Sequence, residues 1–277
     1  MTSPNQPRTA RLYHGPGVRT FDPSAAAVIL PAAVATYLAA AIAAPRDLAV
    51  LAGQFALAAV PIGAVIVGAR ARRAAGATAD SGPGFRAALG LGRAAPRFFV
   101  AALAIGATAW YLNMRLVGLL PIPQDQTHAL AALIDRPPIG AALAMFAVVP
   151  AICEELLFRG VFARALGRDL PLAGAAAISA AVFSAYHLSL VQAVPTLTLG
   201  AALAVIAIRA DSALPAMLAH AINNALAIAI SRDELPALDH WLERHAIAAI
   251  AGAATAVALG LAIAIRAPRP PQIAPSS

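Results

Sequence analysis

The sequence predicts an all-α fold, a polytopic membrane helix bundle with about eight transmembrane helices. Of the 277 residues, 60% are hydrophobic and 12% are charged, which leaves too few polar side chains to cover a soluble globule of this size. The apolar residues also gather into separate runs, most of them close to the ~20 residues that a helix needs to cross a bilayer. We therefore interpret residues 1–277 as a single membrane domain.

The predicted spans are separated by proline, arginine, aspartate and glycine residues, which end or interrupt apolar helices. The sixth span is the shortest. Between the second and third spans, Phe85, Leu89 and Leu91 alternate with Arg86 and Arg93, a pattern typical of a short helix on the membrane surface. The eight spans are expected at residues 24–44, 48–69, 98–120, 139–166, 171–190, 194–208, 212–230 and 246–265.

The arginines indicate the orientation of these spans. A net charge of +7 could mean nucleic-acid binding in a soluble protein, but here the basic residues lie between apolar runs, so the expected partner is the lipid bilayer and not nucleic acid. Fifteen of the 20 basic residues, all arginine, fall on one predicted side and five on the other. Because arginine-rich loops stay in the cytoplasm, we expect a multi-pass protein of the cell membrane with cytoplasmic tails at 1–23 and 267–277.

Ionisable residues inside a membrane span are costly and usually face a protein interior or a watery cavity. The fourth span carries Glu154, Glu155 and Arg159. Adjacent helical residues point about 100° apart, so we expect the two carboxylates to have different roles. Glu155 and Arg159, in contrast, share a face and can form an ion pair. Glu154 is left without a local partner.

Two later spans carry further polar groups. Phe183 lies one helical turn before His187 and can buttress its imidazole, and His220 shares a face with Asn224, while Asn223 is expected to point away from Asn224. Each group alone could be an ordinary interior residue. Their occurrence in successive spans, with few other buried polar residues, predicts one polar site.

The ordered motifs Glu-Glu-x-x-x-Arg, Phe-x-x-x-His and His-x-x-x-Asn resemble those of the CAAX protease and bacteriocin-processing (CPBP, Abi) family of intramembrane proteases, which includes type II CAAX prenyl endopeptidases. The resemblance covers roughly residues 98–230, which we take as a CAAX protease-like core. The first, second and eighth spans carry no motif and are expected to contribute only to the architecture. It implies a helix bundle that encloses a cavity in which a peptide bond is hydrolysed.

The resemblance also implies a role for each motif residue. Glu154 would be the general base for a water held between it and His187, and His220 with Asn224 would stabilise the oxyanion. Glu155, Arg159 and Phe183 would support the site.

The family is often described as metal-dependent, and a glutamate with two histidines is a plausible zinc set. Zinc would then be bound by Glu154, His187 and His220. There is no His-Glu-x-x-His sequence, however, and the residues come from three helices. We therefore favour a metal-free glutamate protease and keep zinc as a possible cofactor.

The expected function is an endopeptidase that acts on a peptide or a membrane-associated protein, in CAAX-type processing, peptide maturation or bacteriocin immunity. One alternative is an ion-coupled membrane transporter, since buried Glu, His and Arg also build proton relays, although no inverted repeat is apparent. The other is a non-catalytic membrane scaffold. At about 1.5 Å per residue, the expected depths of Glu154, His187 and His220 are roughly 18, 24 and 12 Å, so helix tilt or different span ends must bring them together.

Overall fold

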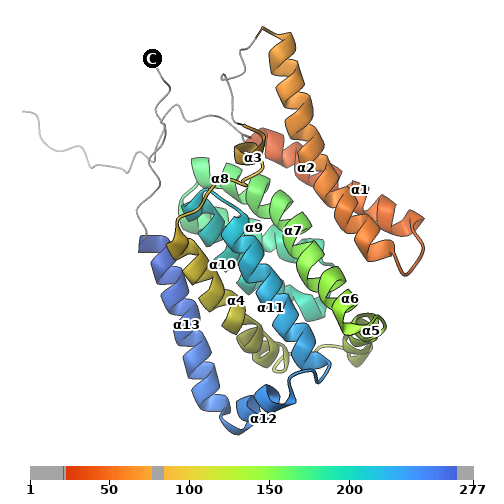
Figure 1. The fold of residues 1–277 in the computed structure, drawn as a ribbon, viewed down its shortest axis with the longest axis vertical. Coiled ribbons are helices and arrows are strands. Elements are labelled where there is room, and N and C mark those ends of the chain that lie inside the picture. Colours follow the sequence, from red (N-terminus) through yellow and green to blue (C-terminus); the bar gives the residue numbers. More distant parts are fainter. Residues whose placement is uncertain (1–20, 22, 77–83, 267–277) are drawn as a thin grey trace, which may run out of the picture.

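The computed structural model describes residues 21, 23–76 and 84–266. Their regular secondary structure is entirely helical, and the helices pack side by side into a bundle from which α1 and α2 lean away as a hairpin (Figure 1). Within these residues, seven helical segments are long and apolar enough to cross a membrane. The predicted polytopic helix bundle is therefore confirmed.

The seven segments match seven of the eight predicted spans closely, with helix ends that differ by a few residues. The fourth is a continuous helical path made of several helices, and the others are single helices. They are α1 (Pro23–Ala43), α2 (Ala49–Ala74), α4 (Pro96–Val117), the path Ile139–Asp169, α10 (Leu190–Ala210), α11 (Leu214–Ser231) and α13 (Ala246–Arg266).

The shortest span is not the one that the sequence indicated. Helix α10 has 21 residues because it continues through Pro195, and the short helix is α9 (Leu172–Tyr186) with 15 residues. Helix α9 stops before His187, Leu188 adopts a positive φ of 49°, and Ser189 caps the start of α10. His187 therefore lies at the end of a helix and not within a long span.

The fourth span changes its helical type around the paired glutamates. It runs through α6 (Ile139–Leu143), the π-helical η1 (Ala144–Val148), α7 (Val149–Glu155), the π-helical η2 (Leu156–Ala163) and α8 (Arg164–Asp169). Both glutamates end the last regular turn before η2. π-Helical turns are rare and occur frequently at functional sites, and here they flank the candidate catalytic residues.

Small residues let the helices approach closely. A large core forms where α4, α10, α11 and α13 meet, and alanine supplies many of its buried side chains. At Gly106 on α4, an added Cβ would lie only 2.6 Å from the carbonyl oxygen of Ala219 on α11. Membrane helices commonly pack through such small residues. This contact holds α4 against α11 at the residue next to His220.

The start of α1 and the end of α13 lie on the same side of the bundle. Arg168 at the end of α8 donates to the carbonyl oxygen of Phe21, which precedes α1, at 2.9 Å. On the same side, where α10 ends, Arg209 donates to the carbonyl oxygen of Ala264 near the end of α13 at 3.3 Å. This placement requires an even number of crossings and therefore agrees with eight spans when the short α9 is included.

Three short helices lie outside the spans. Helix α3 (Phe85–Ala88) occupies the place of the expected surface helix, but Leu89 directly after it is buried in a cluster with Cys153. This segment is thus anchored in the bundle and does not simply lie on lipid. Helices α5 (Gln124–Asp135) and α12 (Pro236–Arg244) connect spans and were not predicted.

Candidate active site

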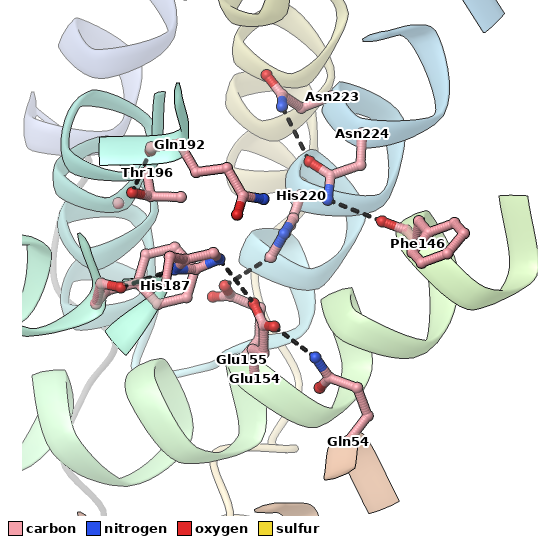
Figure 2. A network of polar contacts seen from close by, with 12 residues as sticks. Gln54, Phe146, Glu154, Glu155, His187, Gln192, Thr196, His220, Asn223 and Asn224 are labelled. Carbon is pink, nitrogen blue, oxygen red and sulfur yellow. Dashed lines mark hydrogen bonds and ion pairs between the residues drawn. The ribbon is translucent and has the colours of Figure 1, made fainter. Parts of the chain in front are cut away.

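The polar residues of the three motifs meet inside the bundle. Figure 2 shows side chains from α7, from the end of α9, from the start of α10 and from α11 pointing toward one another. Glu154 and Glu155 are buried on α7, His187 follows α9, and His220 is buried on α11. The helices thus bring together three residues for which different depths were expected.

Glu154 and His187 face each other at the centre of this group. The Oε2 atom of Glu154 lies 4.0 Å from Nε2 of His187. The two side chains are 5% and 13% exposed, and Oε2 of Glu154 has no hydrogen-bond partner among the described residues. The separation is longer than a direct hydrogen bond and short enough for a single water to bond to both atoms.

The backbone determines which nitrogen of His187 carries a proton. Nδ1 lies 2.9 Å from the carbonyl oxygen of Phe183. A carbonyl oxygen only accepts, so Nδ1 is the donor, and Nε2 of the neutral ring presents a lone pair toward Glu154. With a neutral ring, two acceptor atoms face each other across the 4.0 Å gap.

The other oxygen of Glu154 is bound by a residue that the motifs do not include. Gln54 on α2 donates from Nε2 to Oε1 of Glu154 at 2.6 Å (Figure 2). The second span, which was expected to add only architecture, therefore contacts the site directly. The signal in the sequence is an uncharged polar amide in the middle of an apolar run.

Glu155 joins two helices through one oxygen atom. The expected ion pair is present, with Arg159 NH1 3.0 Å from Oε1 of Glu155. Nδ1 of His220 lies 3.0 Å from the same oxygen. Since a carboxylate accepts, Nδ1 of His220 donates, and Glu155 links the arginine on its own helical path to the histidine on α11.

Arg159 and Phe183 form the wall behind the two histidines. The fully buried guanidinium of Arg159 lies 4.1 Å from the centre of the Phe183 ring and donates to the carbonyl oxygen of Gly200 at 3.1 Å. The Phe183 ring centre is 4.8 Å from that of His187 and 6.0 Å from that of His220, and both contacts are edge-on. Phe183 thus holds both imidazoles, where the sequence had suggested only His187.

Asn224 is oriented by two neighbours. Its Nδ2 donates to the carbonyl oxygen of Phe146 at 3.1 Å, and its Oδ1 accepts from Nδ2 of Asn223, also at 3.1 Å. The expectation that Asn223 points away from Asn224 is therefore wrong. An amide nitrogen carries two protons, so Asn224 keeps one that the contact with Phe146 does not use.

The geometry can be compared with known families. Residues 137–226 match the family model for type II CAAX prenyl endopeptidase Rce1-like proteins. Over this segment the chain is similar to Rce1-like proteins. The matched segment begins near the start of α6, ends within α11 and contains every motif residue from Glu154 to Asn224.

This match agrees with the resemblance seen in the sequence and supports a CAAX-type intramembrane endopeptidase in general terms. A protease domain of this kind acts on a peptide or protein, and the chain is a multi-pass membrane protein. No curated protein matches the chain. No solved structure matches it.

The zinc set that the sequence allowed consists of Glu154, His187 and His220. Among the described residues, no three His, Cys, Asp or Glu side chains are grouped so that they could hold one metal ion. His220 directs Nδ1 to Glu155, whereas His187 faces Glu154. We derive no step through a metal ion, and zinc stays a prediction that a chelator would test.

Gln192 is a further polar residue of the matched segment that the motifs do not include. It lies in the first turn of α10, and Figure 2 shows its side chain extending toward His220. The hydroxyl of Thr196 binds the Gln192 carbonyl oxygen at 2.6 Å and reinforces this turn ahead of Pro195. The side-chain amide of Gln192 thus places an uncharged donor and acceptor on the α10 side of the site.

Proposed function

We propose that the protein is an intramembrane endopeptidase in which Glu154 activates a water for attack on a peptide carbonyl. The observation that supports this most directly is that Oε2 of Glu154 and Nε2 of His187 face each other at 4.0 Å. A water about 2.8 Å from both atoms could donate one hydrogen to each. Its lone pairs would then be free to face a substrate.

The reaction would follow from this arrangement. Glu154 takes one proton from the water as its oxygen bonds to the carbonyl carbon of the peptide. The carbonyl oxygen gains negative charge in the tetrahedral intermediate. When the carbon–nitrogen bond breaks, the leaving nitrogen takes a proton from Glu154, which restores the carboxylate. His187 holds the water in place through its second hydrogen.

The negative oxygen would be stabilised from α11. Asn224 has one amide proton left after its contact with Phe146. His220 donates from Nδ1 to Glu155, so donation from its Nε2 requires the ring to carry both protons. The Glu155 carboxylate is the group that would stabilise this doubly protonated ring, which makes its contact with His220 part of the proposed oxyanion site.

The substrate would be a peptide or the hydrophobic end of a membrane-associated protein, because the site lies within apolar helices and its polar groups are nearly buried. CAAX-type processing, peptide maturation and bacteriocin immunity share this requirement. The family match favours a substrate that is cut close to its C-terminus. We place the protein in the cell membrane with both termini in the cytoplasm.

The test is cleavage of quenched fluorescent peptides by the purified protein in lipid nanodiscs, with wild type compared with Glu154→Gln. The substitution keeps shape but removes the base, so turnover should fall by at least about 10²-fold while folding is retained. Glu234→Gln, at an exposed glutamate, is the matched control and should cleave like wild type. Wild-type cleavage by Glu154→Gln would overturn the proposal.

The same preparation separates the other hypotheses. Activity that is lost with a chelator and recovered with zinc would contradict the metal-free mechanism while leaving an endopeptidase. Proton movement into proteoliposomes that depends on Glu154, without cleavage of any peptide, would instead identify an ion-coupled transporter.

A further inference from the structure

The α1–α2 hairpin reaches the site at one buried residue. Gln54 on α2 is 3% exposed, and its amide nitrogen lies 2.6 Å from Oε1 of Glu154. Helix α2 lies outside the segment 137–226 that matches the Rce1-like family. The hydrogen bond therefore connects the proposed base to a part of the chain that the family match does not assign.

This hydrogen bond distinguishes the two oxygens of the carboxylate. Oε1 of Glu154 is engaged by Gln54, whereas Oε2 faces His187 and has no partner among the described residues. A free carboxylate could rotate and exchange its oxygens. With one oxygen held by a buried donor, the other is kept toward the imidazole, where the activated water would lie.

The hairpin also contacts the histidine side of the site. Gly53, next to Gln54, lies against Tyr37 of α1 so closely that an added Cβ would be 2.6 Å from the tyrosine ring. The Tyr37 ring packs edge-on against Tyr186 at 5.3 Å between centres, and Tyr186 packs against His187 at 5.2 Å. The hairpin thus touches Glu154 through Gln54 and His187 through two aromatic rings.

We propose that Gln54 is a positioning residue for catalysis, which holds Oε1 of Glu154 so that Oε2 is directed at the water shared with His187. This inference rests on the proposed function. It assigns to α2 a role in the geometry of the base. A merely structural amide, by contrast, would satisfy a buried carboxylate without affecting turnover by folded protein.

The first test measures kcat and KM for Gln54→Met, which keeps the length of the side chain and removes the amide. We expect kcat to fall by about 10- to 100-fold, the scale of a hydrogen bond to a charged group, with KM changed less than about twofold because the substrate is not contacted. The matched control is Leu57→Ala, which disturbs the packing of α2 at a fully buried residue that has no hydrogen bond to Glu154. It should lower the unfolding temperature and leave kcat per folded molecule near wild type.

The second test uses Gln54→Glu, which keeps the shape of the side chain. The introduced carboxyl group can donate to Glu154 only when it is protonated, so kcat of this variant relative to wild type should rise as the pH is lowered. A structural role would not produce this dependence. The second variant also decides the question if Gln54→Met fails to fold.

Three results would overturn the inference. These are wild-type kcat in Gln54→Met, an equal loss of kcat in Leu57→Ala, or a ratio of Gln54→Glu to wild type that does not change with pH. Failure of the proposed function is recognised separately, because Glu154→Gln would then retain activity whatever the Gln54 variants do.

Discussion

Glu155 on α7 and His220 on α11 are joined by a hydrogen bond of 3.0 Å from Nδ1 of the imidazole to Oε1 of the carboxylate. The same oxygen is 3.0 Å from Arg159 NH1. A carboxylate that we expected to pair only within its own helix therefore also fixes the ring of a histidine 65 residues away. This contact determines which nitrogen of His220 is left to face a substrate.

Glu155→Gln should reduce turnover even in molecules that remain folded. The amide can still accept from Nδ1 of His220, but it lacks the negative charge that would stabilise a doubly protonated ring. We expect kcat to fall about tenfold or more, the effect of weakening one charged hydrogen bond, with a smaller change in KM. Steady-state kinetics on folded protein would check this, and an unchanged kcat would remove His220 from the oxyanion site.

Arg159→Met should mainly destabilise the protein. Both members of the Glu155–Arg159 pair are fully buried, and removing one partner of a buried ion pair typically costs about 3–5 kcal/mol. A lower unfolding temperature and a lower yield of folded protein are the measurements. The double variant Glu155→Gln/Arg159→Met should recover part of the stability, because no unpaired charge remains, but not the activity. Recovery of both would show that the pair has no part in the chemistry.

Asn224→Ala should lower kcat by about 10²–10³-fold, the usual effect of removing one oxyanion donor. Asn223→Ala removes the group that orients Asn224 through a 3.1 Å hydrogen bond, while the contact of Asn224 with Phe146 remains, so its effect should be smaller. Peptide cleavage kinetics with both variants would establish the order. A larger loss in Asn223→Ala than in Asn224→Ala would reverse the assignment of the two asparagines.

Gly106→Ala should impair both stability and activity. The added methyl group would meet the backbone of Ala219 at 2.6–3.1 Å, so α4 and α11 must separate next to His220. Gly252→Ala on α13 is the matched control, since its methyl group would meet nothing within 4 Å. Thermal unfolding and cleavage assays should show a clear loss for the first variant and none for the second. Equal behaviour would mean that the packing of α4 on α11 is easily rearranged.

A reporter fused after Arg266 should give a cytoplasmic signal. Fifteen of the 20 arginines lie on the side that we place in the cytoplasm, and loops rich in arginine are retained there. A reporter inserted between α5 and α6 should report the opposite side. An extracytoplasmic signal after Arg266 would invert the proposed orientation, although the bundle itself would be unchanged.

The sequence by itself determined the helix bundle, the approximate ends of its spans and the identity of the motif residues. Hydrophobic runs of membrane length have few alternatives to helices, because unpaired backbone groups are too costly in lipid. The Glu155–Arg159 pair could be predicted equally well, since residues four apart on a helix lie on one face. These features depend on local spacing alone.

Only the tertiary structure decided which polar groups meet. Nothing local indicates that Gln54 reaches Glu154 across 100 residues of sequence, or that Glu155 is shared between Arg159 and His220. The end of α9 at Tyr186 was hidden because the apolar run continues beyond it. Contacts between helices depend on how small residues such as Gly106 allow backbones to approach, and on the tilt and rotation that result, which the periodicity of one helix does not contain.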